Sequence, residues 1–190
     1  MAKQFSSIEP AHRAFIARQH ICFTGSADVA GRVNVSPKGH DCLRVLGPAE
    51  VVYLDRTGSG NETAAHVRAT GRLTLMFCAF EGPPMIMRLY GRGAILPRGG
   101  ADYARLLAEA FDGAEPPGAR QMVKLDVDMV QTSCGYAVPE MSYGGDRSVL
   151  DDWAERKGED GLRVYRAEKN AVSIDGRATG LVEPDDAPKR

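Results

Sequence analysis

The feature that most constrains the fold is a series of six or seven strand-like segments between residues 20 and 131. Several alternate polar and apolar side chains with a period of two, which is typical of a half-buried strand. Helices do not alternate regularly with these strands, so the pattern does not favour a doubly wound parallel sheet. It predicts a mainly β protein with short helices and a closed or nearly closed antiparallel barrel. The expected strands are 20–27, 32–36, 43–46, 50–55, 73–80, 85–96 and 121–131.

The length of 190 residues fits one domain with a terminal elaboration. We expect the domain to cover residues 1–182, with a helical C-terminal elaboration over 150–182. Residues 183–190 are polar and contain proline, and we expect a loosely held tail there. A short helix is expected to begin at Ser59, because the spacing from Ser59 to Glu62 is that of a capping box.

Charge and apolar content exclude several classes of protein. A formal net charge of −1 gives no general basic bias towards nucleic acid. No apolar stretch approaches the roughly 20 residues of a transmembrane helix, and the N-terminus lacks the apolar run of a signal peptide. The four cysteines are far apart in the sequence, which suits a reducing compartment. We therefore expect a cytoplasmic protein with neither nucleic-acid nor membrane partners.

The cysteines and histidines show no spacing typical of a metal site. Cys134 follows a predicted strand, where a nucleophile could be presented. No histidine lies near it in the sequence to act as its base. We therefore expect Cys134 to be a buried structural thiol.

Two polar segments, 34–39 and 53–63, each lie at the end of a predicted strand. Both carry cations, hydroxyls and glycine, and the second also runs into the expected helix N-terminus, whose partial positive charge favours an anion. If the two strands are neighbours, the segments converge and can hold a phosphate. On spacing alone, two ordinary hairpin turns explain them equally well, and it is their pairing that favours a site. The candidate phosphate ligands are Ser36, Lys38, Gly39, Arg56, Thr57, Ser59 and Asn61.

Six short motifs occur in a specific order and spacing along the chain. They are VNVSPKG at 33–39, YLDRTGSGNET at 53–63, GRLTLMF at 71–77, RLYGRG at 88–93, QTSCGYAVP at 131–139 and KNAVSIDG at 169–176. With these motifs, about residues 10 to 178 resemble the FMN-binding split-barrel family named after pyridoxamine 5'-phosphate oxidase, in particular its branch of oxidase-related proteins.

The resemblance implies a homodimeric split antiparallel β-barrel with FMN at the subunit interface and a small-molecule substrate. It implies that backbone groups of Val35, Ser36 and Pro37 line the isoalloxazine ring. Lys38 would reach the phosphate. In the second segment, residues Tyr53 to Asp55 would flank the flavin. The phosphate site would be completed by Arg56, Thr57, Ser59 and Asn61.

Two departures from the oxidase affect the expected activity. The oxidase has an Arg-Lys pair at the start of the short helix, where this chain has Gly60, Asn61 and Glu62, so Lys38 and Arg56 are left to carry the charge. The oxidase also ends in a segment that binds its substrate and the flavin, and that segment is not found here. We therefore do not expect oxidation of pyridoxamine phosphate.

Two further residues are candidates with an open alternative. Arg88 could meet an anionic substrate or the partner's flavin, or it could be an outward-facing charge on its strand. Tyr136 could pack near the partner's flavin, or it could be an aromatic plug at the exit of a strand.

The sequence thus predicts an FMN-binding flavoprotein that acts as a flavin-dependent oxidoreductase on a small molecule, with FMN as cofactor and no metal. One alternative is a non-catalytic FMN-binding or sensing protein. Another is a relative with the same fold that handles a deazaflavin or haem. No general base is identified.

Overall fold

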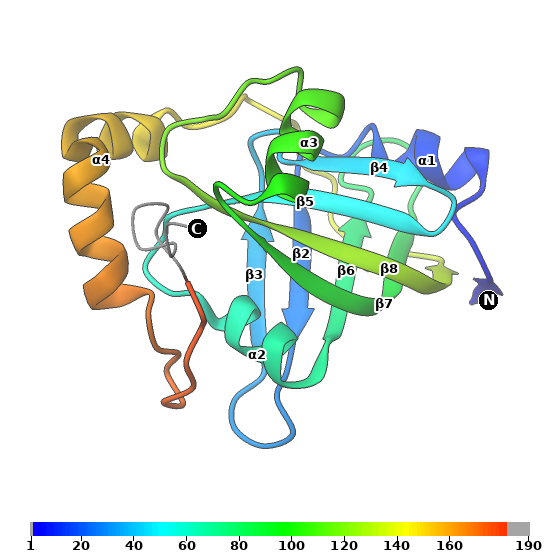
Figure 1. The fold of residues 1–190 in the computed structure, drawn as a ribbon. Coiled ribbons are helices and arrows are strands. Elements are labelled where there is room, and N and C mark those ends of the chain that lie inside the picture. The colour runs from blue at the N-terminus through cyan, green and yellow to red at the C-terminus, as the bar shows by residue number, and fades with distance from the viewer. Residues whose placement is uncertain (1, 182–190) are drawn as a thin grey trace.

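The computed structural model describes residues 2–181, which form one eight-stranded antiparallel sheet with four helices around it (Figure 1). The strand order is β3-β2-β6-β7-β8-β5-β4, and β1 pairs with the far end of β8. The sheet curls without closing, which confirms the split-barrel prediction. The strands are β1 Lys3–Phe5, β2 Cys22–Ser26, β3 Asn34–Lys38, β4 Leu43–Gly47, β5 Glu50–Arg56, β6 Arg72–Cys78, β7 Ile86–Pro97 and β8 Ala119–Ser133.

The short strand β1 was not expected from the sequence. It spans only three residues and pairs Phe5 with Val130 at the end of β8. A strand this short carries almost no periodicity, so only its pairing with β8 identifies it.

The helices are α1 Pro10–Ile16, α2 Glu62–Thr70, α3 Ala101–Ala110 and α4 Val149–Lys169. Helix α2 begins later than predicted, because Asn61 and not Ser59 occupies its N-cap. It ends at Gly71, whose φ of 71° is the left-handed conformation that glycine adopts most easily. The predicted helical C-terminal elaboration contains α4, and the expected tail at 183–190 lies outside the described residues.

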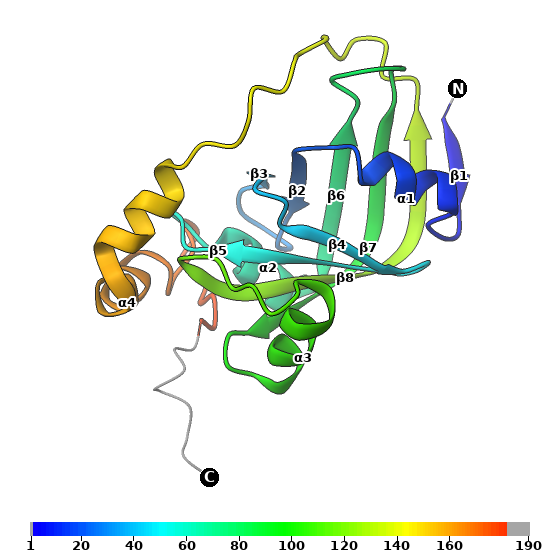
Figure 2. The same ribbon diagram turned by 90° about the horizontal axis from the view of Figure 1, so that it is seen from above.

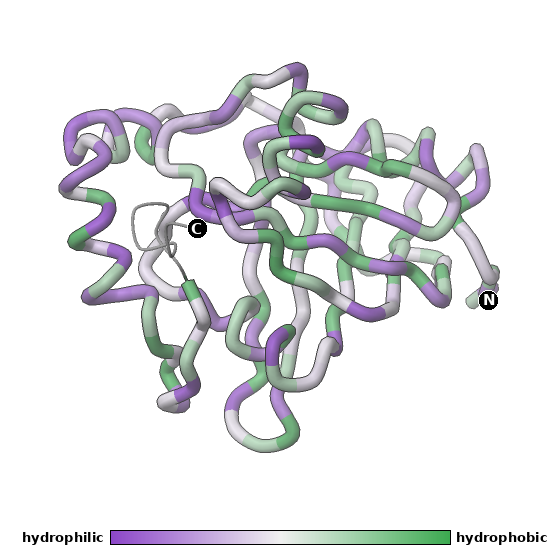
Figure 3. The backbone as a smooth tube through the Cα atoms, in the orientation of Figure 1, coloured by the Kyte–Doolittle hydropathy of each residue, from purple (hydrophilic) through white to green (hydrophobic). Residues whose placement is uncertain are grey.

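Helix α4 stands beside the sheet and is connected to β8 by a long segment that runs outside it (Figure 2). The helix is kinked at Gly158, where φ is 63°. It is more hydrophilic than the strands (Figure 3). Its buried residues, Ala154, Leu162 and Arg166, mark the face that packs against the rest of the chain.

Strand β5 explains how the core is built. Val51 and Tyr53 lie in the large core cluster, whereas Val52 and Leu54 lie in a second cluster with Tyr103 and other residues of α3. Because β5 is covered on both faces, its sequence is continuously apolar and does not alternate. All four of its apolar side chains are at most 3% exposed.

Strands β7 and β8 form the longest pairing of the sheet and shift register between Tyr90 and Gly91. At Gly91 the backbone of β8 comes so close that a Cβ atom would lie 1.9 Å from the Asp126 carbonyl oxygen. The bulge therefore requires glycine, because no rotamer change moves a backbone atom. Within residues 2–181, no helix is long and apolar enough to span a membrane.

Candidate functional site

The two predicted polar segments meet, although their strands are not neighbours. Strand β3 lies at one edge of the sheet, and β5 lies next to the opposite edge. The curl of the sheet brings these edges together, so that Lys38 Nζ at the end of β3 lies 2.7 Å from Asp55 Oδ1 near the end of β5. Barrel curvature therefore produces the convergence that was expected from adjacent strands.

A pocket of about 640 Å³ lies where these segments meet. It is formed by β3, the end of β5, the loop leading into α2, the start of β8 and the segment that follows α4. The structure thus brings most of the predicted ligands to one place. Those that line the pocket are Ser36, Pro37, Lys38, Asp55, Arg56, Ser59 and Asn61.

Other predicted residues in these segments do not line the pocket. Val35 is 65% exposed and occupies one of the more exposed positions along β3. Tyr53 is fully buried in the core, and the Lys38 ammonium lies 5.3 Å from the centre of its ring. Thr57 is buried, and its hydroxyl donates to the carbonyl oxygen of Gly118 at 2.8 Å.

Arg88 and Tyr136 also lie outside this pocket. Arg88 Nη1 donates to Ser133 Oγ on the neighbouring strand at 3.4 Å. Tyr136 is 82% exposed, so it does not plug the strand exit within this chain.

Asp55 is the centre of a buried charge network on the floor of the pocket. Its Oδ1 accepts a hydrogen bond from Lys38, and its Oδ2 accepts from Arg120 Nε at 2.8 Å and Gln121 Nε2 at 2.9 Å. Burial would raise the pKa of the Asp55 carboxyl, but the Arg120 guanidinium and the Lys38 ammonium outweigh it and hold the pKa well below its ordinary value. The network positions Lys38 and balances its charge.

Sequence reasoning missed Arg120. It is the second residue of strand β8, 65 residues away from Asp55 in sequence, yet it is 5% exposed and lines the same pocket. The available signal was a pair of polar residues, Arg120 and Gln121, at the start of an otherwise regular apolar alternation. Buried polar side chains require partners, which points to a polar site at that end of the strand.

Arg56 is held in place on its other side. Its Nη2 forms an ion pair with Asp151 in the first turn of α4, and its Nε donates to the carbonyl oxygen of Pro117 at 3.1 Å. The Arg56 side chain is only 8% exposed. Arg56 therefore joins α4 to the rim of the pocket as well as contributing charge to it.

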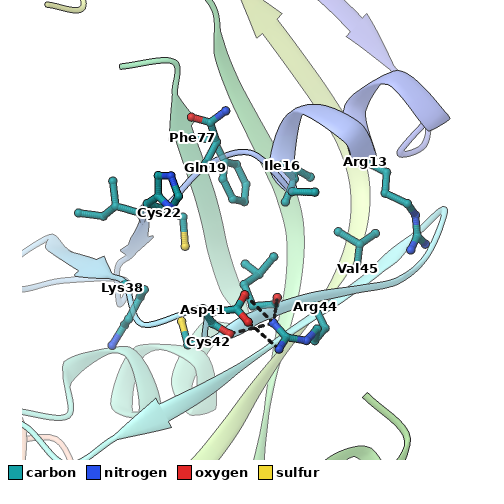
Figure 4. Close-up of a pocket in the computed structure, with 15 residues that line it drawn as sticks. Arg13, Ile16, Gln19, Cys22, Lys38, Asp41, Cys42, Arg44, Val45 and Phe77 are labelled. Carbon is teal, nitrogen blue, oxygen red and sulfur yellow. Dashed lines mark hydrogen bonds and ion pairs between the residues drawn. The ribbon is translucent and has the colours of Figure 1, made fainter. Parts of the chain in front are cut away.

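A second cavity, of about 370 Å³, lies on the other side of Lys38 between β2, α1 and β4, and Gly39 lines this cavity instead of the larger pocket. The side chains of Cys22 and Cys42 point into it from opposite walls (Figure 4). Burial raises the pKa of the Cys42 thiol to about 11 and raises that of Cys22 as well, so both thiols are protonated at neutral pH and are poor nucleophiles. Cys134 was expected to be a buried thiol, and that prediction was wrong: it lies in the irregular segment just after β8 and is exposed.

The composition of the larger pocket fits a phosphate group. Four cations line it, against two carboxylates, and the hydroxyls of Ser36 and Ser59 add donors. The pocket also includes the N-terminal residues of α2, where the unpaired backbone N–H groups favour an anion. The four cations are Lys38, Arg56, Arg120 and Lys169, and the two carboxylates are Asp55 and Glu62.

Comparison with known proteins gives concordant matches. Residues 8–134 match the sequence model of the family described as pyridoxamine 5'-phosphate oxidase. The chain is 36% identical to the pyridoxamine 5'-phosphate oxidase family protein ustO of Aspergillus flavus, in a match that covers 90% of this chain and 75% of the relative.

Two solved structures share the fold. The HupZ protein from Group A Streptococcus matches with a TM-score of 0.51 and 18% identity, over 64% of this chain and 91% of that chain. A putative pyridoxamine 5'-phosphate oxidase from Lactobacillus delbrueckii matches with a TM-score of 0.52 and 17% identity, over 66% and 94%. These structures show the fold, and the family model and the sequence relative show that this chain belongs to the pyridoxamine 5'-phosphate oxidase family.

Proposed function

We propose that this protein binds FMN and acts as a flavin-dependent oxidoreductase on a small molecule other than pyridoxamine phosphate. The observation that carries the proposal is the pocket between β3 and the loop into α2, with its excess of cations over carboxylates. An excess of positive charge with hydroxyl donors suits a phosphate monoester. Membership of the family supports a flavin as the molecule that carries it.

In this proposal, the phosphate is held by the cations Lys38 and Arg56 and by the hydroxyls of Ser36 and Ser59. Asp55 with Arg120 keeps Lys38 in position. The isoalloxazine ring lies along β3. Among the described residues β3 pairs only with β2, so the backbone N–H and C=O groups of its outer edge remain available to the polar atoms of the ring. The bound flavin would supply the hydride or electron transfer, and the protein would supply position and electrostatics.

The proposed site lies at the open edge of the barrel, which a second copy of the chain would cover. Several apolar side chains are exposed beside β3 and the pocket, among them Val33 at 72%, Val35 at 65% and Ile174 at 70%. Apolar groups gathered at a functional site favour an interface. We therefore propose a homodimer with the flavin between the subunits.

The dimer is tested by size-exclusion chromatography with light scattering on the flavin-loaded protein. We expect a mass of twice the 20.5 kDa chain, with flavin absorbance in the same peak. A monomer that retains FMN tightly would contradict an interface site.

The phosphate placement is tested by replacing Lys38 and Arg56 together with alanine. We expect FMN binding to weaken about tenfold or more, because charge-assisted hydrogen bonds to the phosphate are lost. Riboflavin lacks the phosphate, so its binding should change less than about threefold. Both affinities are measured by the quenching of flavin fluorescence on titration with protein.

The matched control replaces Arg72 and Arg105 with alanine, which removes the same charge from exposed positions outside the pocket. It should leave both affinities unchanged. Equal losses for FMN and riboflavin in the Lys38 and Arg56 variant would mean that the phosphate lies elsewhere.

A wild-type protein that binds neither flavin, or that is found by mass spectrometry to carry a haem or deazaflavin, would overturn the proposed cofactor. Reduction of the bound flavin by a nicotinamide cofactor, followed by turnover with an acceptor, separates an enzyme from a carrier.

A further inference from the structure

One wall of the pocket comes from the C-terminal elaboration. Lys169, the last residue of α4, lines the pocket together with Val172, Ser173 and Ile174 of the segment that follows the helix. These residues lie beyond the part of the chain that matches the family model, which ends at residue 134. The pocket is therefore built jointly by the barrel and by the elaboration.

The elaboration is fixed to the pocket by buried hydrogen bonds centred on Asn170, which is 0% exposed. Its Nδ2 donates to the carbonyl oxygen of Gly58 at 3.0 Å, and its Oδ1 accepts from Arg120 Nη1 at 2.7 Å. Gly58 and Arg120 both line the pocket. Because a satisfied buried network admits little displacement, the end of α4 has a defined position relative to the pocket.

Glu62 and Asp175 hold the segment after Asn170. The Glu62 carboxylate, at the start of α2, accepts a hydrogen bond from the backbone N–H of Ile174 at 3.0 Å. Asp175 forms an ion pair with Arg32 and accepts a hydrogen bond from its backbone N–H at 2.7 Å. The elaboration is thus tied both to α2 and to the turn before β3, on the two sides of the pocket.

The charge balance of the pocket singles out Lys169. Lys38 and Arg120 are paired with Asp55, and Arg56 is paired with Asp151. Lys169 lies on the pocket with its side chain exposed, and it is paired with no carboxylate in the part of the chain that the structure describes. Its long stem allows the ammonium to reach an anion in the pocket without breaking an existing ion pair.

We propose that Lys169 binds the phosphate of the ligand, and that the C-terminal elaboration serves to place it there. This inference rests on the proposed function for its ligand and assigns a role to the elaboration. Asn61 and Glu62 stand at the positions where more positive charge was expected from the family resemblance. In the structure Glu62 anchors the segment that directly follows Lys169. The elaboration would therefore supply, from its own wall of the pocket, the positive charge that the start of α2 lacks.

The test compares Lys169→Ala with the wild-type protein in titrations with FMN and with riboflavin. We expect FMN binding to weaken about fivefold and riboflavin binding to stay within about twofold, because only FMN carries the phosphate. The matched control is Arg163→Ala, which removes one positive charge from the same helix at an exposed position outside the pocket. The control should bind both flavins as the wild type does.

A second measurement separates this inference from the proposed function. Inorganic phosphate at millimolar concentration should raise the midpoint of thermal unfolding of the wild type and of Arg163→Ala, but raise that of Lys169→Ala less. If the wild type binds FMN and Lys169→Ala binds it equally well, the inference is overturned and the proposed function stands. If the wild type binds neither flavin, the proposed function fails. The phosphate experiment then tests the role of Lys169 by itself. If phosphate raises the unfolding midpoint equally in all three proteins, or in none of them, that role is overturned.

Discussion

Replacing Asp55 with alanine should lower the free energy of unfolding by about 3–5 kcal/mol, because it leaves buried cations without their carboxylate. Asp55 is 3% exposed, and the Arg120 guanidinium beside it is 5% exposed. Lys38 also loses its carboxylate partner, so the same substitution should displace the ammonium that is proposed to hold the phosphate. Urea denaturation measures the stability, and flavin titration at temperatures where the variant is folded measures the binding.

The matched control is Asp126→Ala on β8. Asp126 is paired with Lys124, but its carboxylate is 57% exposed, and exposed pairs contribute about 0–1 kcal/mol. A loss for Asp55→Ala no greater than that of the control would show that the network does not stabilise the fold.

Asp55 should also give the stability a specific dependence on pH. Its pKa is lowered in the folded protein from an ordinary value of 3.8. A carboxyl with a lowered pKa contributes stability that is fully present above its ordinary pKa and is lost as the pH falls through the folded value. The stability difference between the wild type and Asp55→Asn should therefore be constant from pH 7 to 5 and should shrink below about pH 4. A difference that stays constant down to pH 3 would contradict the assigned ionisation.

Replacing Gly91 with alanine should destabilise the protein by about 3 kcal/mol, the upper end of the usual cost of overpacking, because a clash with backbone cannot be relieved by a side-chain rotation. The added Cβ would lie 1.9 Å from the Asp126 carbonyl oxygen, so β7 and β8 would have to separate at the bulge. These two strands form the centre of the sheet, and the start of β8 carries Arg120 to the pocket. We expect a lower unfolding midpoint in urea and weaker flavin binding.

Gly47→Ala is the matched control for this substitution. Gly47 also lies in a strand at a register shift, but a Cβ at that position would meet nothing within 4 Å. Its effect on stability should remain within about 1 kcal/mol. If the two alanine variants were equally stable, the close approach at Gly91 would not constrain the sheet.

The strands could be predicted because their signal is local. In β3 and over residues 123–128 of β8, less exposed and more exposed side chains alternate, and the sequence shows the same period of two. Prediction was less accurate where the sequence pattern is very short or where two residues could fill the same role. Strand β1 is too short to show a period, and the capping pattern at Ser59 competed with Asn61, which is the N-cap in the structure.

The sequence predicted several residues that line the candidate site, but it did not predict which neighbouring side chains face the interior instead. Ser36, Lys38 and Ser59 follow from the residue types that bind phosphate, and all three line the pocket. Thr57 was named with them for its hydroxyl, and Tyr53 was named from the family resemblance. In a strand and the turn that follows it, neighbouring side chains face in different directions, and these two face the interior.

The sequence by itself determined the fold class, the two polar segments and the kind of group they suit, because periodicity and residue chemistry are local properties. Only the tertiary structure decided that the segments meet, since β3 and β5 lie far apart in the sheet and are joined by its curvature. The tertiary structure also decided which cations of the pocket are already paired with a carboxylate. Asp55, Arg120 and Lys169 come from three distant parts of the chain, and no local sequence pattern shows that they line one pocket.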